Sequence, residues 1–237
     1  GSNPAKAKVA LAALEQAKNT VMLSRPDVKS EINYIYGQED LPTFDNFGAT
    51  LIGFIVFFFV FLVSGISFLQ ERNSGTLEKM LSTPIRRWEI VVGYVLGFGA
   101  FTVLQSILVS WYCVYVLKVM MIGSFALILL ITLLAAMISL TLGILMSTLA
   151  NNEFQMIQFI PLIIVPQVFF SGLFDLPPGV DIVGYIMPLY YIADALTKVM
   201  IKGLGLADIA GDLVIILACS VLFMTLNTLL LKKYRRI

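Results

Sequence analysis

Residues 68–93 read FLQERNSGTLEKMLSTPIRRWEIVVG, a short charged stretch set between two long apolar runs. The run before it covers residues 47–69 and the run after it covers 90–117, and neither contains Asp, Glu, Lys or Arg. A helix needs about 20 apolar residues to cross a bilayer. The pattern therefore predicts two membrane-spanning helices joined by a compact polar loop.

Three further long apolar runs follow along the chain. The sequence has 237 residues, of which 59% are hydrophobic and 13% are charged, whereas soluble domains carry about 25% charged residues. These numbers predict an all-α polytopic membrane protein, since five such runs exceed what a soluble core of this size needs. The expected spans are residues 47–69, 90–117, 124–149, 154–174 and 209–231.

The composition argues against several other classes of function. A net charge of +1 without a basic stripe outside the membrane flanks gives no sign of nucleic-acid binding. Histidine is absent, and Cys113 and Cys219 lie inside apolar runs, so we expect no catalytic, cofactor-binding or metal-binding residues. No GxxxxGK[ST] motif occurs, so any ATP that drives this protein must bind to another chain.

Lys and Arg near the span ends predict the orientation, because cytoplasmic flanks are enriched in them. The loop 70–89 and the tail after residue 231 are both basic, which predicts that both are cytoplasmic. Residues 1–45 would then be extracytoplasmic. We interpret them as the remnant of an extracytoplasmic domain that follows a lost first helix, so the parent protein would have six spans.

The loop itself predicts a short helix. Gly75 permits a tight turn, Thr76 can cap a helix, and Pro84 stops it. Leu77 falls at helical spacing with Met80 and Leu81, which gives the helix an apolar edge. Such a helix suits docking into a partner's groove; the alternative is a helix lying on lipid headgroups.

Two stretches resemble the ABC-2 type permeases, the membrane subunits of ATP-binding cassette transporters. In the loop the family pattern is matched by Glu71, Arg72, Gly75, Thr76, Leu77, Glu78, Leu81, Thr83, Pro84, Arg87, Glu89 and Gly93, and Gln70 replaces the family's first arginine. Residues 171–196 resemble the family's stretch of short external helices, with matches at Gly172, Pro177, Pro178, Pro188 and Tyr190.

The resemblance implies a function and partners. It implies a bacterial exporter permease, working as a homodimer or heterodimer in the cytoplasmic membrane and moving a drug, antimicrobial or lipid-like substrate. ATP and Mg would sit on a separate ATPase subunit. The loop would be the coupling helix, and the residues implied to couple to the ATPase are Glu71, Arg72, Gly75, Thr76, Leu77, Glu78, Leu81, Thr83, Pro84 and Arg87.

Polar residues inside the spans are candidates for a substrate path, because such groups face protein or water rather than lipid. The alternative is that they hydrogen-bond neighbouring helices. These residues are Gln105, Gln158, Gln167 and Asn227.

Small residues recur every four positions in the third span, which predicts close helix packing within the chain or at a dimer contact. They are Ala135, Ser139, Gly143 and Ser147.

Residues 175–206 predict one or two short interfacial or re-entrant helices on the extracytoplasmic side. Asp194 and Lys198 are spaced to form an i,i+4 ion pair there.

Two other functions are compatible with five spans. A membrane scaffold or sensor would need no ATPase and would tolerate loss of the loop 70–89. An ion-driven transporter normally shows mid-membrane charges or internal repeats, and neither is evident.

Overall fold

The computed structural model describes residues 13, 16, 43–174 and 181–230, apart from the side chains at 43–46, 78, 81, 87 and 181. The chain divides into two compact units, Gly1–Phe47 and Gly48–Ile237. No strand occurs in the described ranges. The helices are α2 (Thr43–Asn73), α3 (Thr76–Leu81), α4 (Arg87–Trp111), η1 (Tyr112–Val116), α5 (Phe125–Leu149), α6 (Glu153–Val168), η2 (Phe169–Leu173), α7 (Asp181–Gly184), α8 (Pro188–Met200) and α9 (Leu206–Leu230).

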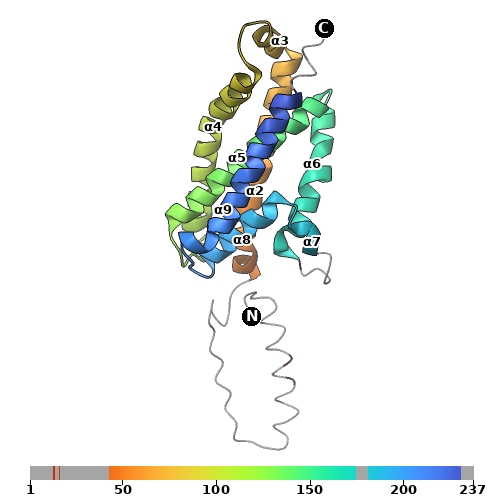
Figure 1. The fold of residues 1–237 in the computed structure, drawn as a ribbon. Helices are drawn as coiled ribbons and strands as arrows, with labels where there is room; N and C mark the ends of the chain where they lie inside the picture. Colours follow the sequence, from red (N-terminus) through yellow and green to blue (C-terminus); the bar gives the residue numbers. More distant parts are fainter. Residues whose placement is uncertain (1–12, 14–15, 17–42, 175–180, 231–237) are drawn as a thin grey trace, which may run out of the picture. The chain divides into compact units, whose positions relative to one another are not determined.

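Five helical stretches are long and apolar enough to cross a membrane, which confirms the predicted all-α polytopic class (Figure 1). Their ends fall within a few residues of the predicted ones. The largest difference is at the end of α2, which continues to Asn73 through residues that we assigned to the polar loop. The five stretches are Phe47–Asn73, Trp88–Val116, Phe125–Leu149, Glu153–Leu173 and Leu206–Leu230.

The small residues of α5 pack against α2 within the chain. The Ser139 hydroxyl donates a hydrogen bond to the carbonyl of Phe57. A Cβ atom added at Gly143 would lie 2.2 Å from the Ser64 Oγ and 2.7 Å from the Phe61 carbonyl oxygen. Glycine is therefore required where the two helices approach most closely. Of the two expectations for this stripe, packing inside the protomer is the one that the structure shows.

Two spans end in π-helical turns. Tyr112–Val116 closes the second span and Phe169–Leu173 closes the fourth, the latter just after Pro161 and Pro166. Proline removes a backbone donor from the helical ladder, which favours local rearrangement of this kind. Gly172 then has a φ of +84°, which only glycine adopts readily, and it turns the chain out of the helix.

The polar loop and the short helices lie at opposite ends of the bundle. In Figure 1, α3 lies at one end with the last turn of α2, while α7 and α8 lie toward the other. α8 packs on α5, α6 and α9, and its apolar face is buried.

Candidate functional site

The connection from α2 to α4 is a tight and largely exposed turn around α3. Gly75 has a φ of +77°, the left-handed conformation that the sequence predicted for it. The hydroxyl oxygens of Ser74 and Thr76 are 2.9 Å apart, which closes a hydrogen bond at the start of α3. Thr83 donates to the Met80 carbonyl, with an oxygen-to-oxygen distance of 2.6 Å, and Pro84 follows after the helix has ended.

Arg72 does not extend into solvent from this turn. Its Nη1 atom donates to the carbonyl oxygens of Ser147 and Thr148 at 2.9 and 3.2 Å, and Nη2 donates to the carbonyl of Ala150. These carbonyls belong to the last turn of α5, whose acceptors lack partners within the helix. Arg72 therefore caps α5 and joins its end to the end of α2. The sequence assigned Arg72 to coupling with the ATPase, and the described contacts show which groups of its own chain the guanidinium binds.

The apolar edge of α3 also faces inward. Leu77 is 1% exposed, and Met80 packs against the same core. Leu77 and Met80, two of the three residues of the predicted docking edge, thus anchor α3 to its own membrane domain. The surface left for a partner combines polar and apolar groups. Thr76, Lys79, Ser82, Thr83 and Pro84 are exposed, and so are Ile85 and Trp88 just beyond them. The side chains of Glu78, Leu81 and Arg87, also assigned to coupling, lie outside the described residues.

The start of α6 is also joined to the end of α2. The side-chain nitrogen Nε2 of Gln70 donates to Glu153 Oε1 at 3.0 Å, which links the two helices. Gln70, which stands where the family pattern has an arginine, thus joins two spans. Asn152 caps α6 by accepting from the Gln155 backbone at 2.8 Å. Glu71 is half-buried beside these groups.

The start of α4, at the other end of the loop, has a side-chain cap. The backbone N–H of Arg86 donates to Glu89 Oε2 at 2.8 Å, so the glutamate reaches back to the residue before the helix. An acidic side chain at this position also complements the positive end of the helix dipole. The loop is therefore held at both of its ends by defined hydrogen bonds.

The four polar residues predicted for a substrate path lie in different surroundings. Asn227 donates to the Thr141 carbonyl at 2.8 Å, which is the helix-to-helix hydrogen bond that we gave as the alternative. Gln158 is exposed on α6, while Gln167 is buried in the same helix. Gln105 lines a groove between α2 and α4, and none of the other three lines it. The set does not mark one shared cavity in the described structure.

The end of the bundle that holds α7 and α8 carries the remaining predicted residues. Pro188 is buried as the first residue of α8, where its missing N–H costs nothing. Tyr190 packs edge-on against Tyr185, with ring centroids 5.1 Å apart. The pKa of Tyr190 is raised to about 12, mainly because the side chain is buried and secondly because the Tyr185 hydroxyl lies beside it. Pro177 and Pro178 lie outside the described residues, and Gly172 forms the turn described above.

An ion-pair cluster joins α8 to the last span. Lys198 Nζ lies 2.8 Å from Asp194, as the i,i+4 spacing predicted, and 2.7 Å from Asp212 of α9. Burial alone would lower the pKa of Lys198, but its bonds to both carboxylates outweigh burial and raise the pKa. Sequence reasoning missed Asp212. The one signal for it was a carboxylate within an otherwise apolar span, where charge is costly unless it is paired.

These features define a multi-pass α-helical membrane protein whose polar loop is joined by hydrogen bonds to the ends of several spans. Within the described residues no three of Asp, Glu, His and Cys gather as a metal site would require. The chain belongs to the ABC-2 family transporter proteins, whose family pattern it matches over residues 1–229. The match includes residues 1–45, in which we found no motif.

Relatives of known description support this family. The chain is 25% identical over 194 residues to "ABC transporter G family member 20" of Dictyostelium discoideum, covering 80% of this chain and 27% of that protein. It is 25% identical over 177 residues to the "Probable multidrug ABC transporter permease YbhS" of Escherichia coli K12, covering 73% and 47% respectively. Against YbhR of that strain, identity is 22% over 161 residues, covering 66% and 44%. The chain thus spans less than half the length of these relatives.

Proposed function

We propose that this chain is the membrane-spanning permease part of an ATP-driven exporter that moves an amphipathic or hydrophobic substrate. The observation that carries the proposal is the loop around α3, which exposes Lys79, Ser82 and Thr83 on its outer face and is fixed to the bundle by Leu77 on its inner face. ATP and Mg would bind to a partner chain, since the sequence holds no phosphate-binding loop of its own.

The contacts of the loop suggest how force would pass into the membrane. A partner that displaces α3 also displaces the end of α2, and Arg72 carries that displacement to α5. Ser139 and Gly143 pack α5 closely against α2, so these two helices would move as one body. Alternating access would then be a movement of this pair against α4 and α6. The hydrogen bond from Gln70 to Glu153 is one contact that such a movement would break.

The partners follow from the same proposal. One permease of this size supplies half of a translocation path, so a second copy or a homologous permease would complete it, beside an ABC ATPase subunit. The loop and α3 would face the cytoplasm, α7 and α8 would lie on the extracytoplasmic side, and the membrane would be the bacterial cytoplasmic membrane. The multidrug names of the two relatives from Escherichia coli favour a drug-like substrate.

Transport can be tested in inverted membrane vesicles that hold the full-length permease and its ATPase. ATP should drive uptake of a cationic amphipathic dye or of a fluorescent lipid analogue, and an ATPase variant that cannot hydrolyse ATP should abolish it. Replacing the exposed residues 82–84 by glycines should reduce uptake while leaving the permease folded. Uptake that does not depend on ATP would contradict the proposal, and a permease that retains no ATPase would favour the scaffold or sensor.

A further inference from the structure

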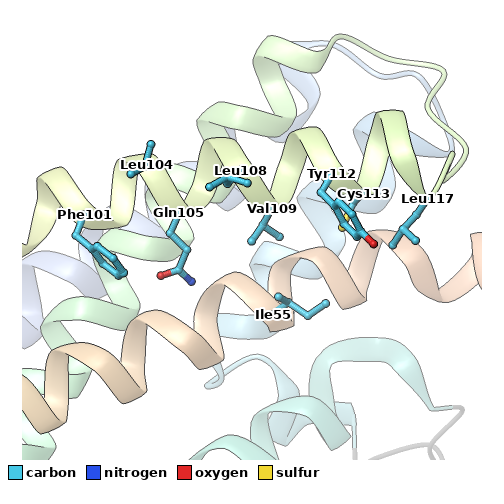
Figure 2. Close-up of a pocket in the computed structure, with 9 residues that line it drawn as sticks. All are labelled: Ile55, Phe101, Leu104, Gln105, Leu108, Val109, Tyr112, Cys113 and Leu117. Carbon is cyan, nitrogen blue, oxygen red and sulfur yellow. The ribbon is translucent and has the colours of Figure 1, made fainter.

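A groove runs between α2 and α4 in the half of the bundle away from α3. It encloses about 460 Å³, within the range of about 300–1,000 Å³ that small-molecule sites occupy. Figure 2 shows Phe101, Gln105 and Val109 extending from α4 toward α2, where Ile55 lies on the opposite wall. The groove lies wholly within the unit Gly48–Ile237.

One polar group of this apolar groove lacks a hydrogen-bond partner. The Nε2 atom of Gln105 is buried and has no hydrogen-bond partner among the described residues. The other lining side chains are aliphatic or aromatic apart from the thiol of Cys113. An amide donor left unsatisfied in a membrane interior is costly, because no bulk water can replace the missing acceptor. The geometry therefore asks for an acceptor supplied from outside the described residues.

The depth of Gln105 limits what that acceptor can belong to. It lies 17 positions after Trp88 and 11 positions before Val116, the two ends of the span. At 1.5 Å per residue these separations are roughly 26 and 17 Å, which places Gln105 well inside the hydrocarbon layer. A phospholipid that lies in the bilayer keeps its ester groups near the interface and offers only hydrocarbon at this depth. The acceptor must therefore sit in the body of a mostly apolar molecule.

The wall of the groove is irregular where it widens beyond Leu108. Tyr112 and Cys113 line it and belong to the π-helical turn that closes the second span. Turns of this kind are rare inside helices and occur frequently at functional sites. The same turn places the Cys113 side chain on the groove.

We propose that the groove between α2 and α4 binds a neutral, mostly apolar small molecule whose carbonyl, ether or hydroxyl oxygen accepts a hydrogen bond from Gln105. The ligand enters from the lipid phase, because Leu104 and Leu108 leave that side of the groove exposed. This goes beyond the proposed function, because it concerns binding whether or not the molecule is carried across the membrane. Binding needs no ATPase, so its failure and a failure of transport are distinguishable.

Benzophenone is a suitable probe, because its carbonyl is its sole hydrogen-bonding group and light attaches it to nearby C–H bonds. The full-length protein in lipid nanodiscs would be irradiated with increasing benzophenone, and adducts mapped by mass spectrometry. We expect saturable labelling within residues 101–117. Replacing Gln105 by leucine (Gln105→Leu) should raise the half-saturating concentration about 3- to 10-fold, the value of one hydrogen bond.

Two tryptophan variants on α4 provide the matched comparison. Val109→Trp, at a lining position whose side chain extends toward α2, fills the groove and should abolish saturable labelling, whereas Leu96→Trp, at a 70% exposed position outside it, should leave labelling unchanged. Gel filtration of each variant reports whether it is folded. Labelling no stronger than that around Leu162, an exposed residue of α6, would overturn the proposal. An unchanged half-saturating concentration in Gln105→Leu would do the same, as would absence of labelling because another helix or a second copy covers the groove.

Discussion

Replacing Arg72 by methionine removes the guanidinium that joins the end of α2 to the end of α5. The acceptors are the carbonyls of Ser147, Thr148 and Ala150, three residues that are at most 7% exposed, so water cannot easily replace the lost donors. A hydrogen bond from a charged donor contributes about 1.5–3 kcal/mol, and bonds that share one donor group are not additive. We therefore expect Arg72→Met to lower the free energy of unfolding by about 3 kcal/mol.

The assay is thermal unfolding in mild detergent, followed by the fluorescence of Trp88 and Trp111. For a chain of this size about 3 kcal/mol corresponds to a fall in Tm of about 6–12 °C. The Tm of Arg72→Lys should lie between those of the wild type and Arg72→Met, because a lysine ammonium cannot form the paired hydrogen bonds of a planar guanidinium. Lys79→Met is the matched control, since it removes a positive charge from an exposed position on the same loop. If Arg72→Met has the same Tm as this control, Arg72 does not hold α2 to α5 and the proposed coupling route is wrong.

Three further substitutions test other parts of the structure. Gly143→Ala should cost about 1–3 kcal/mol by overpacking against α2, whereas Gly97→Ala, where no atom lies within 4 Å, should be neutral or stabilising; equal Tm values would refute the close approach. Lys198→Met should cost about 3 kcal/mol because it strands Asp212 without its partner, and adding Asp212→Asn should restore most of the loss. Since the pKa of Lys198 is raised above 10.5, its contribution is complete at neutral pH and declines as pH rises through that raised value. A difference in Tm between the wild type and Lys198→Met that disappears between neutral pH and 10.5 would contradict the pairing. Glu78→Lys should release or uncouple the ATPase with no change in Tm, and full ATPase coupling in that variant would remove Glu78 from the contact.

The number and position of the spans could be predicted because a bilayer sets a length that the apolar runs satisfy on their own. The turn at Gly75 could be predicted because glycine has a conformational freedom that other residues lack. Both features are local in the chain, and both agree with the structure.

Features that depend on distant partners could not be predicted in this way. Arg72 meets carbonyls 75 or more positions away, and Leu77 turns inward because a hydrophobic surface lies beneath it. Neither periodicity nor composition states which side of a short helix the bundle will cover. The pairing of Asp212 with Lys198 could not be predicted for the same reason, since it depends on how the chain returns between α8 and α9.

The central claim is that the loop around α3 is the docking site for an ATPase, and co-purification tests it most directly. The full-length permease, tagged and expressed with the ATPase encoded beside it, would be purified in mild detergent with and without residues 74–84. We predict that the intact permease retains an active ATPase and that the deletion loses it while the spans remain folded. An intact permease that retains no ATPase, or a deletion that retains all of it, would contradict the claim.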